Sequence, residues 1–119
     1  MTHYRIDFVL LKYLVYGLII TSALCSICFA DNGDRTLIFF SADWCRYCAM
    51  AKSDINTHRL LSETIKKYEV IILDFDKDKD QVEGYKIKNI PTFIVIENKK
   101  EIKRQIGYDG PMQLNAFLK

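Results

Sequence analysis

Four short segments after residue 35 are rich in β-branched, aromatic and other apolar residues, and we predict a strand in each. The first two are continuous apolar runs, which are typical of strands buried on both faces of a parallel sheet. The last carries a lysine and an arginine, as expected of an edge strand. In chain order the predicted strands are Thr36–Phe40, Val70–Phe75, Thr92–Ile96 and Glu101–Ile106.

Helical patterns occupy the intervals between strands. A run of good helix formers begins near Cys45, after the first strand. We predict a break at Asp54–Thr57, where Asn56 or Thr57 caps a second helix that continues to about Lys67. Three apolar residues of this second helix are expected to face the core: Leu60, Leu61 and Ile65. Strand, helix and strand in this order form a βαβ unit, so we predict an α/β fold.

Two shorter helices complete the pattern. One is predicted at Asp80–Tyr85 and the other at Pro111–Leu118, where proline stands at a first helical position. Ahead of the first of these, Asp76–Asp80 alternates in charge. A calcium-binding loop would need glycine at its sixth position and glutamate at its twelfth, and this segment has neither. We therefore predict a solvated loop there.

The first thirty residues have a different pattern. The 18 residues Tyr13–Ala30 carry no charge, and Arg5 and Lys12 precede them. A basic start, an apolar stretch and a small-residue end are typical of a cleaved secretory signal. The alternative is a membrane anchor over residues 8–30, since 18 helical residues alone span about 27 Å of a roughly 30 Å hydrocarbon core. Both interpretations predict that residues 31–119 are exported as one domain.

The four cysteines form two Cys-x-x-Cys pairs in different surroundings. Cys25 and Cys28 lie inside the apolar N-terminal stretch, and we interpret them as small hydrophobic residues of a segment that is removed or buried in lipid. A second redox pair and a lipid attachment site are the alternatives. Lipid attachment calls for a small preceding residue, and Leu24 and Ile27 stand there. The other pair belongs to the predicted exported domain.

Composition narrows the classes of function. The chain has 119 residues, of which 50% are hydrophobic and 27% are charged, which suits one globular domain. Its 17 basic and 15 acidic residues are interleaved and give a net charge of +2. We therefore predict no nucleic-acid partner.

The second pair, Cys45 and Cys48, stands between the first predicted strand and the following helix. Free N–H groups at a helix start stabilise a Cys45 thiolate, and the positive charge of Arg46 lowers the pKa of this thiol further. Because Cys48 is three residues on, it can form a disulfide with Cys45 or attack a mixed disulfide there. We expect an exposed Cys45, a buried Cys48, and Trp44 packed over the thiols.

Other interpretations of this pair stay open. A zinc site needs about four ligands, whereas residues 31–119 offer only Cys45, Cys48 and His58 as soft ligands. We predict no metal site, and we interpret His58 as a surface helix residue. A purely structural disulfide is disfavoured, because a three-residue spacing constrains the unfolded chain little. A copper-carrying site of two thiolates is the non-enzymatic alternative.

Three motifs give the chain, from Thr36 to Leu118, a resemblance to the thioredoxin-like superfamily. They are Ala42-Asp43-Trp44-Cys45-Arg46-Tyr47-Cys48, then Tyr85-Lys86-Ile87-Lys88-Asn89-Ile90-Pro91-Thr92-Phe93, and Gly107 with the closing helix. The first motif particularly resembles the C-terminal domain of the membrane disulfide reductase of the bacterial periplasm. The resemblance implies a trimmed thioredoxin-like fold, in which helices flank a four-stranded mixed sheet of order 2-1-3-4.

The resemblance also implies roles for the site residues. Cys45 matches the attacking cysteine and Cys48 the resolving one. Pro91 matches the cis-proline that faces the disulfide, and the backbone of Ile90 would pair with an extended substrate segment. The supporting residues are Trp44, Arg46 and Tyr47. No cofactor is expected beyond the redox-active disulfide.

One position departs from the family pattern. Cytoplasmic thioredoxins carry a buried aspartate six residues before the first cysteine, and this chain has Phe39 there. The usual base for the resolving thiol is therefore missing, and its role falls to water, to Asp43 or to no residue.

Together with the predicted signal or anchor, the resemblance implies an exported thiol–disulfide oxidoreductase, located in a bacterial periplasm. It would reduce disulfides of protein substrates through Cys45 and Cys48 and would be re-reduced by a membrane electron donor. A disulfide oxidase or isomerase is the first alternative. A non-catalytic copper-binding or assembly module is the second.

Overall fold

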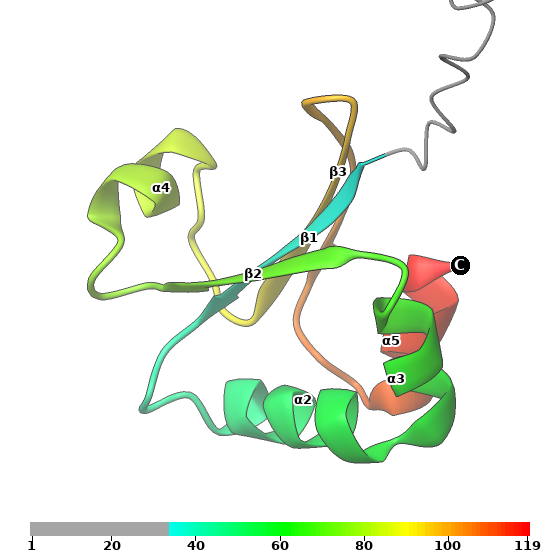
Figure 1. The fold of residues 1–119 in the computed structure, drawn as a ribbon. Coiled ribbons are helices and arrows are strands. Elements are labelled where there is room, and N and C mark those ends of the chain that lie inside the picture. The colour runs from blue at the N-terminus through cyan, green and yellow to red at the C-terminus, as the bar shows by residue number, and fades with distance from the viewer. Residues whose placement is uncertain (1–33) are drawn as a thin grey trace, which may run out of the picture. The chain divides into compact units, whose positions relative to one another are not determined.

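The computed structural model describes residues 34–119, which fold into a mixed sheet and four helices (Figure 1). The strands are β1 (Arg35–Ser41), β2 (Glu69–Asp74), β3 (Thr92–Glu97) and β4 (Lys100–Ile106). The helices are α2 (Arg46–Thr57), α3 (Arg59–Ile65), α4 (Lys79–Gly84) and α5 (Pro111–Leu118). Each predicted strand and helix is present, with ends that differ by a few residues.

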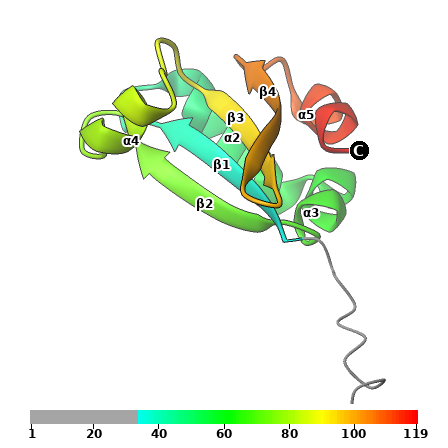
Figure 2. The same cartoon turned by 90° about the horizontal axis from the view of Figure 1, so that it is seen from above.

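The sheet has the order β2-β1-β3-β4, which confirms the predicted topology (Figure 2). Strand β1 pairs in parallel with β2, and its other neighbour, β3, is antiparallel to it and to β4. The parallel pair is joined by α2 and α3, as a βαβ connection requires. The helix that begins at Cys45 therefore starts where the central strand β1 ends.

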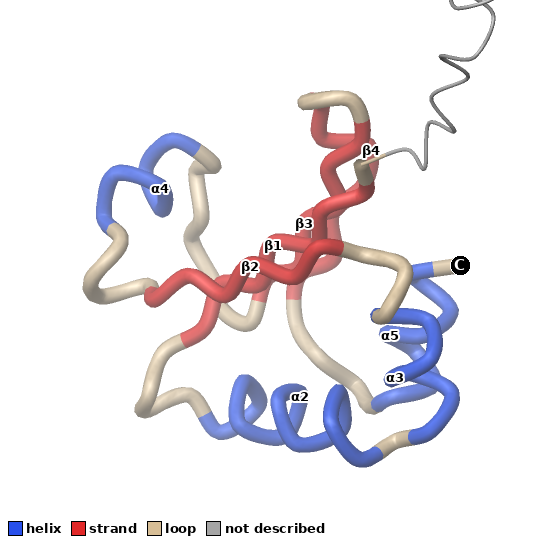
Figure 3. The backbone as a smooth tube through the Cα atoms, viewed as in Figure 1, coloured by secondary structure: helices blue, strands red, loops and turns tan. Residues whose placement is uncertain are grey.

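Helices α2, α3 and α5 cover one face of the sheet, whereas α4 packs on the other face (Figure 3). Alternate side chains of β1 point to the two faces, so Phe39 belongs to the larger core cluster and Phe40 to the smaller. Phe39 stacks on Phe93, with ring centroids 4.6 Å apart. This aromatic pair lies in the same cluster as both cysteines.

The break between the first two helices falls later than predicted. Helix α2 continues through the predicted break and ends at Thr57. His58 then caps α3, because its Nδ1 accepts a hydrogen bond from the N–H of Leu61 at 3.5 Å. The prediction of Asn56 or Thr57 as the cap was wrong. Both side chains bond to carbonyls one turn back inside α2 instead.

Two burial predictions also need correction. Leu60 is 49% exposed, because it points away from the sheet, while Leu61 and Ile65 face the core as predicted. Strand β2 is not buried on both faces, since it forms an edge of the sheet, and Ile72 is 52% exposed. At the opposite edge, β4 carries the charged side chains expected there.

The predicted signal or anchor, with Cys25 and Cys28, lies outside the described residues. Among residues 34–119, the structure contains no helix with the length and apolar character needed to cross a membrane.

Candidate active site

A disulfide between Cys45 and Cys48 lies at the start of helix α2. Cys45 is the N-cap of the helix, with extended backbone angles. A turn leads into it, in which the N–H of Cys45 donates to the carbonyl of Ala42 at 3.1 Å. The carbonyl of Cys45 already accepts from Ala49, the first bond of the helix. The local structure thus places Cys45 at the start of a helix, as the sequence predicted.

The start of the helix supplies a hydrogen bond to the Cys45 sulfur. The backbone N–H of Cys48 donates to Sγ of Cys45 at 3.2 Å. This is one of the N–H groups that have no partner inside the helix, and the positive end of the helix dipole lies at the same place. Both features favour negative charge on Cys45, which is the condition for a nucleophilic thiolate.

The two cysteines differ less in exposure than expected. Cys48 is fully buried, as predicted, but Cys45 is only 6% exposed. The prediction of an openly exposed Cys45 was therefore wrong for the oxidised form, because the N-cap position turns this side chain back over the first turn of α2. Of these two cysteines, only Cys45 has surface that is exposed to a partner.

Trp44 lies beside the site but is 67% exposed. Its indole N–H donates to Oδ2 of Asp76 at 2.8 Å, on the loop after β2. Asp76 is held in turn by its own N–H, which donates to Oδ1 of Asp74 at 2.8 Å. This N–H is the main reason that the pKa of Asp74 lies below its usual value, and the N–H of Lys77 adds to the effect. The sequence did not reveal this anchor for Trp44.

Arg46 and Tyr47 occupy the first turn of α2 and point to solvent. Tyr47 is 59% exposed, and no ion pair of Arg46 is present within residues 34–119. Together with Trp44, they are exposed neighbours of Cys45 in the sequence. They are available for contacts with a partner molecule.

The Ile90–Pro91 segment is brought to the same end of the sheet by the strand pairing. Thr92 pairs with Phe40 near the end of β1, so Pro91 lies beside Ser41, where the cysteine turn begins. The Ile90–Pro91 peptide bond is cis and Pro91 is buried. Within the described residues, neither the N–H nor the carbonyl of Ile90 makes an internal backbone hydrogen bond.

A residue that the sequence analysis missed stands next to this segment. Ile106, at the end of β4, pairs with Thr92 and is 62% exposed. The following residue, Gly107, adopts a positive φ of 88° and donates its N–H to the carbonyl of Pro91 at 2.8 Å. A side chain other than glycine is disfavoured in that conformation. Gly107 was part of a motif in the sequence, but Ile106 before it matched the pattern of an ordinary strand residue and was therefore not predicted as a site residue.

Phe39 occupies the position of the aspartate that thioredoxins of the cytoplasm carry. It is fully buried and stacked on Phe93. The structure thus has an apolar ring below the cysteines, where the resemblance would place a titratable group. Asp43, one of the candidate substitutes, is exposed.

A part-buried polar contact joins Tyr108 to Asp54 of α2. The hydroxyl of Tyr108 donates to Oδ2 of Asp54 at 2.6 Å, and the ring lies 6.4 Å from that of Phe93. Burial raises the pKa of Tyr108 above its usual value, and the hydrogen bond and charge of Asp54 raise it further. This contact ties the loop after Gly107 to the helix that carries Cys48.

We expect Tyr108→Phe to lower the free energy of unfolding by about 1–2 kcal/mol at pH 7, because Asp54 loses a hydrogen bond. The difference in unfolding free energy between the wild type and Tyr108→Phe should shrink above about pH 10. There the unfolded chain releases a phenol proton that the folded chain retains, so the wild type loses the stability that this group contributes. Urea unfolding of both proteins at pH 7 and pH 11 measures this. If the stability difference is the same at pH 7 and pH 11, the Tyr108 hydroxyl does not titrate differently in the folded and unfolded chains.

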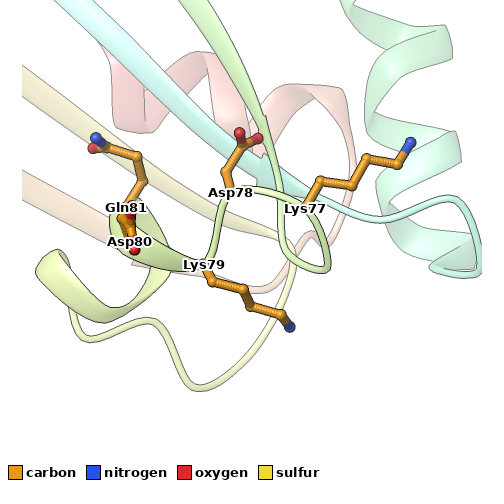
Figure 4. A pocket seen from close by; sticks show the side chains of 5 residues that line it. All are labelled: Lys77, Asp78, Lys79, Asp80 and Gln81. Atoms are coloured by element: carbon orange, nitrogen blue, oxygen red, sulfur yellow. The ribbon is translucent and has the colours of Figure 1, made fainter.

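A separate polar pocket lies where the loop after β2 meets the start of α4 (Figure 4). The side chains of Asp78 and Lys79 point to opposite sides of the chain there, and Asp78 accepts a hydrogen bond from the N–H of Asp74. Across residues 34–119, no three His, Cys, Asp or Glu side chains gather into a group that could hold a metal ion. The pocket is lined by Lys77, Asp78, Lys79, Asp80 and Gln81.

Comparison with protein families gives a match to the thioredoxin family model over residues 26–119. The chain belongs to the thioredoxin family. Its sequence is 30% identical over 81 residues to thioredoxin from Chlamydia trachomatis, covering 66% of this chain and 76% of that one. It is also 30% identical over 80 residues to an H-type thioredoxin from Fagopyrum esculentum, covering 65% of this chain and 64% of that protein.

Solved structures share the fold of this chain. Trxlp from Edwardsiella tarda has a TM-score of 0.64 at 25% identity, covering 78% of this chain and 92% of that one. A thioredoxin-fold protein from Helicobacter pylori has a TM-score of 0.66 at 21% identity, covering 73% and 68% of the two chains, which shows a shared fold. The chain spans 52% of thioredoxin 2 from Plasmodium falciparum and 64% of the Fagopyrum esculentum thioredoxin. Several curated relatives are therefore considerably longer than the matched region.

Proposed function

We propose that this thioredoxin-family protein is an exported thiol–disulfide oxidoreductase that reduces disulfides in other proteins. The observation that carries the proposal is the Cys45–Cys48 disulfide at the N-terminus of α2, with the Cys45 sulfur held by a helix N–H group. The membership of the family and the order of its motifs support it.

In the proposed reaction the Cys45 thiolate attacks one sulfur of a substrate disulfide. A bond forms between Cys45 and that sulfur, the substrate disulfide breaks, and the other substrate sulfur leaves as a thiolate that takes up a proton. Cys48 then loses its proton and attacks Cys45. This forms the Cys45–Cys48 disulfide and releases the second substrate thiol, so two electrons pass to the substrate.

Substrate contacts are proposed to come from the two segments that flank the disulfide. The free N–H and carbonyl of Ile90 suit pairing with an extended peptide. Each segment has exposed apolar side chains beside it: Trp44 and Tyr47 adjoin the cysteines, and Ile106 pairs with Thr92, next to Pro91. Exposed apolar side chains at both segments favour a protein substrate over a small charged one.

The direct test is reduction of insulin disulfides by dithiothreitol with catalytic amounts of the protein, together with a copper titration of the reduced form. We expect faster insulin reduction that does not depend on added metal. Stoichiometric copper binding without any acceleration would contradict the proposal and would favour the metal-carrier alternative.

We also propose that residues 31–119 act outside the cytoplasm, in a bacterial periplasm, with a membrane partner as electron donor. The charges at Arg5 and Lys12 before the apolar run Tyr13–Ala30 support export, either by cleavage of a signal or through a membrane anchor. Fractionation of expressing bacteria should place the domain in the periplasmic or membrane fraction. Recovery of the full-length chain in the cytosol would show the export proposal to be wrong.

A further inference from the structure

A buried hydroxyl group without a hydrogen-bond partner lies four residues before Cys45. Ser41, the last residue of β1, is 1% exposed, and its Oγ makes no hydrogen bond. Within residues 34–119 it is the one buried side-chain oxygen or nitrogen in this condition. Buried polar groups in folded proteins are nearly always paired. The Ser41 hydroxyl is thus an exception among the buried side chains of the described residues.

Ser41 lies on the face of the sheet that is covered by the cysteine helix. Side chains alternate along a strand, so Ser41 lies on the same face of the sheet as Leu37 and Phe39. That face packs against α2 in the cluster that contains Cys45 and Cys48. The carbonyl of Ser41 accepts the N–H of Phe75 at 2.8 Å, which fixes the backbone at this point. The side chain is therefore held where β1 meets the start of α2.

The sulfur of Cys48, the resolving cysteine, accepts no hydrogen bond within residues 34–119. The Cys45 sulfur accepts the N–H of Cys48, but no hydrogen bond to the Cys48 sulfur is present among the described residues. Cys48 is fully buried, so a thiolate there is not stabilised by bulk water. Phe39 supplies neither a base nor a hydrogen bond. The reaction proposed above nevertheless requires negative charge on Cys48.

We propose that the Ser41 hydroxyl donates a hydrogen bond to the Cys48 sulfur once this sulfur is released from the disulfide. The inference rests on the proposed function, because attack by Cys48 on the mixed disulfide is one of its steps. In that step the Cys48 proton leaves, the bond from Cys48 to Cys45 forms, the bond from Cys45 to the substrate sulfur breaks, and the departing thiolate is protonated. Ser41 keeps its own proton and stabilises the Cys48 thiolate. In the oxidised form neither cysteine sulfur accepts a hydrogen bond from this hydroxyl, so the proposal requires the Cys48 sulfur to approach Ser41 when the disulfide opens.

Ser41→Ala tests this role in the full-length protein. The reduced form of this variant loses a hydrogen bond, so the equilibrium constant for its oxidation by glutathione should rise about threefold to tenfold. This corresponds to a reduction potential of the cysteine pair that is more negative by about 15–30 mV. A mixed disulfide of Cys45 with 2-nitro-5-thiobenzoate reports the resolving step. Release of the coloured thiol should slow about tenfold at pH 7, and the midpoint of its pH profile should move upward. Ser53→Ala, on the exposed side of α2, is the matched control and should behave as the wild type.

The stability of the oxidised form separates this role from a structural one. Removing an unpaired buried hydroxyl should leave the urea midpoint of oxidised Ser41→Ala unchanged or raised. The proposal is overturned if the glutathione constant and the pH profile match those of the wild type. It is equally overturned if oxidised Ser41→Ala is strongly destabilised, because the hydroxyl would then have a partner in the oxidised form. The glutathione equilibrium and the release of the coloured thiol use only small thiols. They therefore test the role of Ser41 even if the wild type fails to reduce insulin and the proposed function is wrong.

Discussion

Cys45→Ser is expected to reduce the rate of insulin reduction to that of dithiothreitol alone, a loss of about a thousandfold or more in the catalysed rate. The hydroxyl of serine is not ionised at neutral pH, so the helix N–H groups that favour a thiolate have no anion to stabilise. The same variant should form no mixed disulfides with cellular proteins. The measurement is the initial rate of insulin precipitation at equal protein concentrations.

The matched control for this variant is Cys28→Ser, which changes a cysteine in the apolar N-terminal stretch. It should retain the wild-type rate. A rate that falls equally in both variants would assign a redox role to the first pair, and full activity of Cys45→Ser would remove the basis of the proposed mechanism.

Cys48→Ser is expected to accumulate mixed disulfides with its substrates. Cys45 still attacks in this variant, but the intramolecular attack that releases the substrate is lost. Non-reducing gels of the expressed protein should show new high-mass bands that disappear with reductant, and mass spectrometry identifies the trapped partners. The burial of Cys48 supports this assignment, since a fully buried sulfur is reached by its neighbour and not by a separate protein.

The opposite pattern would reverse the roles of the two cysteines. If Cys45→Ser traps partners and Cys48→Ser does not, then Cys48 is the nucleophile and the N-cap geometry has been misinterpreted. If neither variant traps partners or loses activity, the metal-binding alternative is the one to test.

Much of the fold could be predicted because its core strands have a strong pattern. The run Thr36–Phe40 is continuous and apolar, and it became the central strand with neighbours on both sides. The position of Cys45 at a helix start followed from the change of pattern after that strand. The same reasoning failed for β2, because an apolar run has the same appearance in an edge strand as in a central one, and pairing decides which it is.

The site could be predicted only where it is continuous in sequence or where the family resemblance supplied it. The disulfide and its flanking residues lie within one short segment, and the resemblance added Ile90 and Pro91. The contact between Trp44 and Asp76 joins residues 32 positions apart, and the one between Tyr108 and Asp54 joins residues 54 apart. Such pairs depend on the packed arrangement of strands and helices. The low exposure of Cys45 likewise depends on its cap conformation, which composition does not specify.

The equilibrium of the Cys45–Cys48 pair with glutathione tests the central claim most directly, because it asks whether this disulfide is a reversible redox couple and in which direction it works. Alkylation of free thiols and mass spectrometry across a series of glutathione ratios give the potential. A reductase is expected to have a potential of about −270 mV, as thioredoxin does. A potential of about −120 mV would instead identify a strong oxidant. A pair that stays oxidised at every glutathione ratio would contradict the account of a redox-active site.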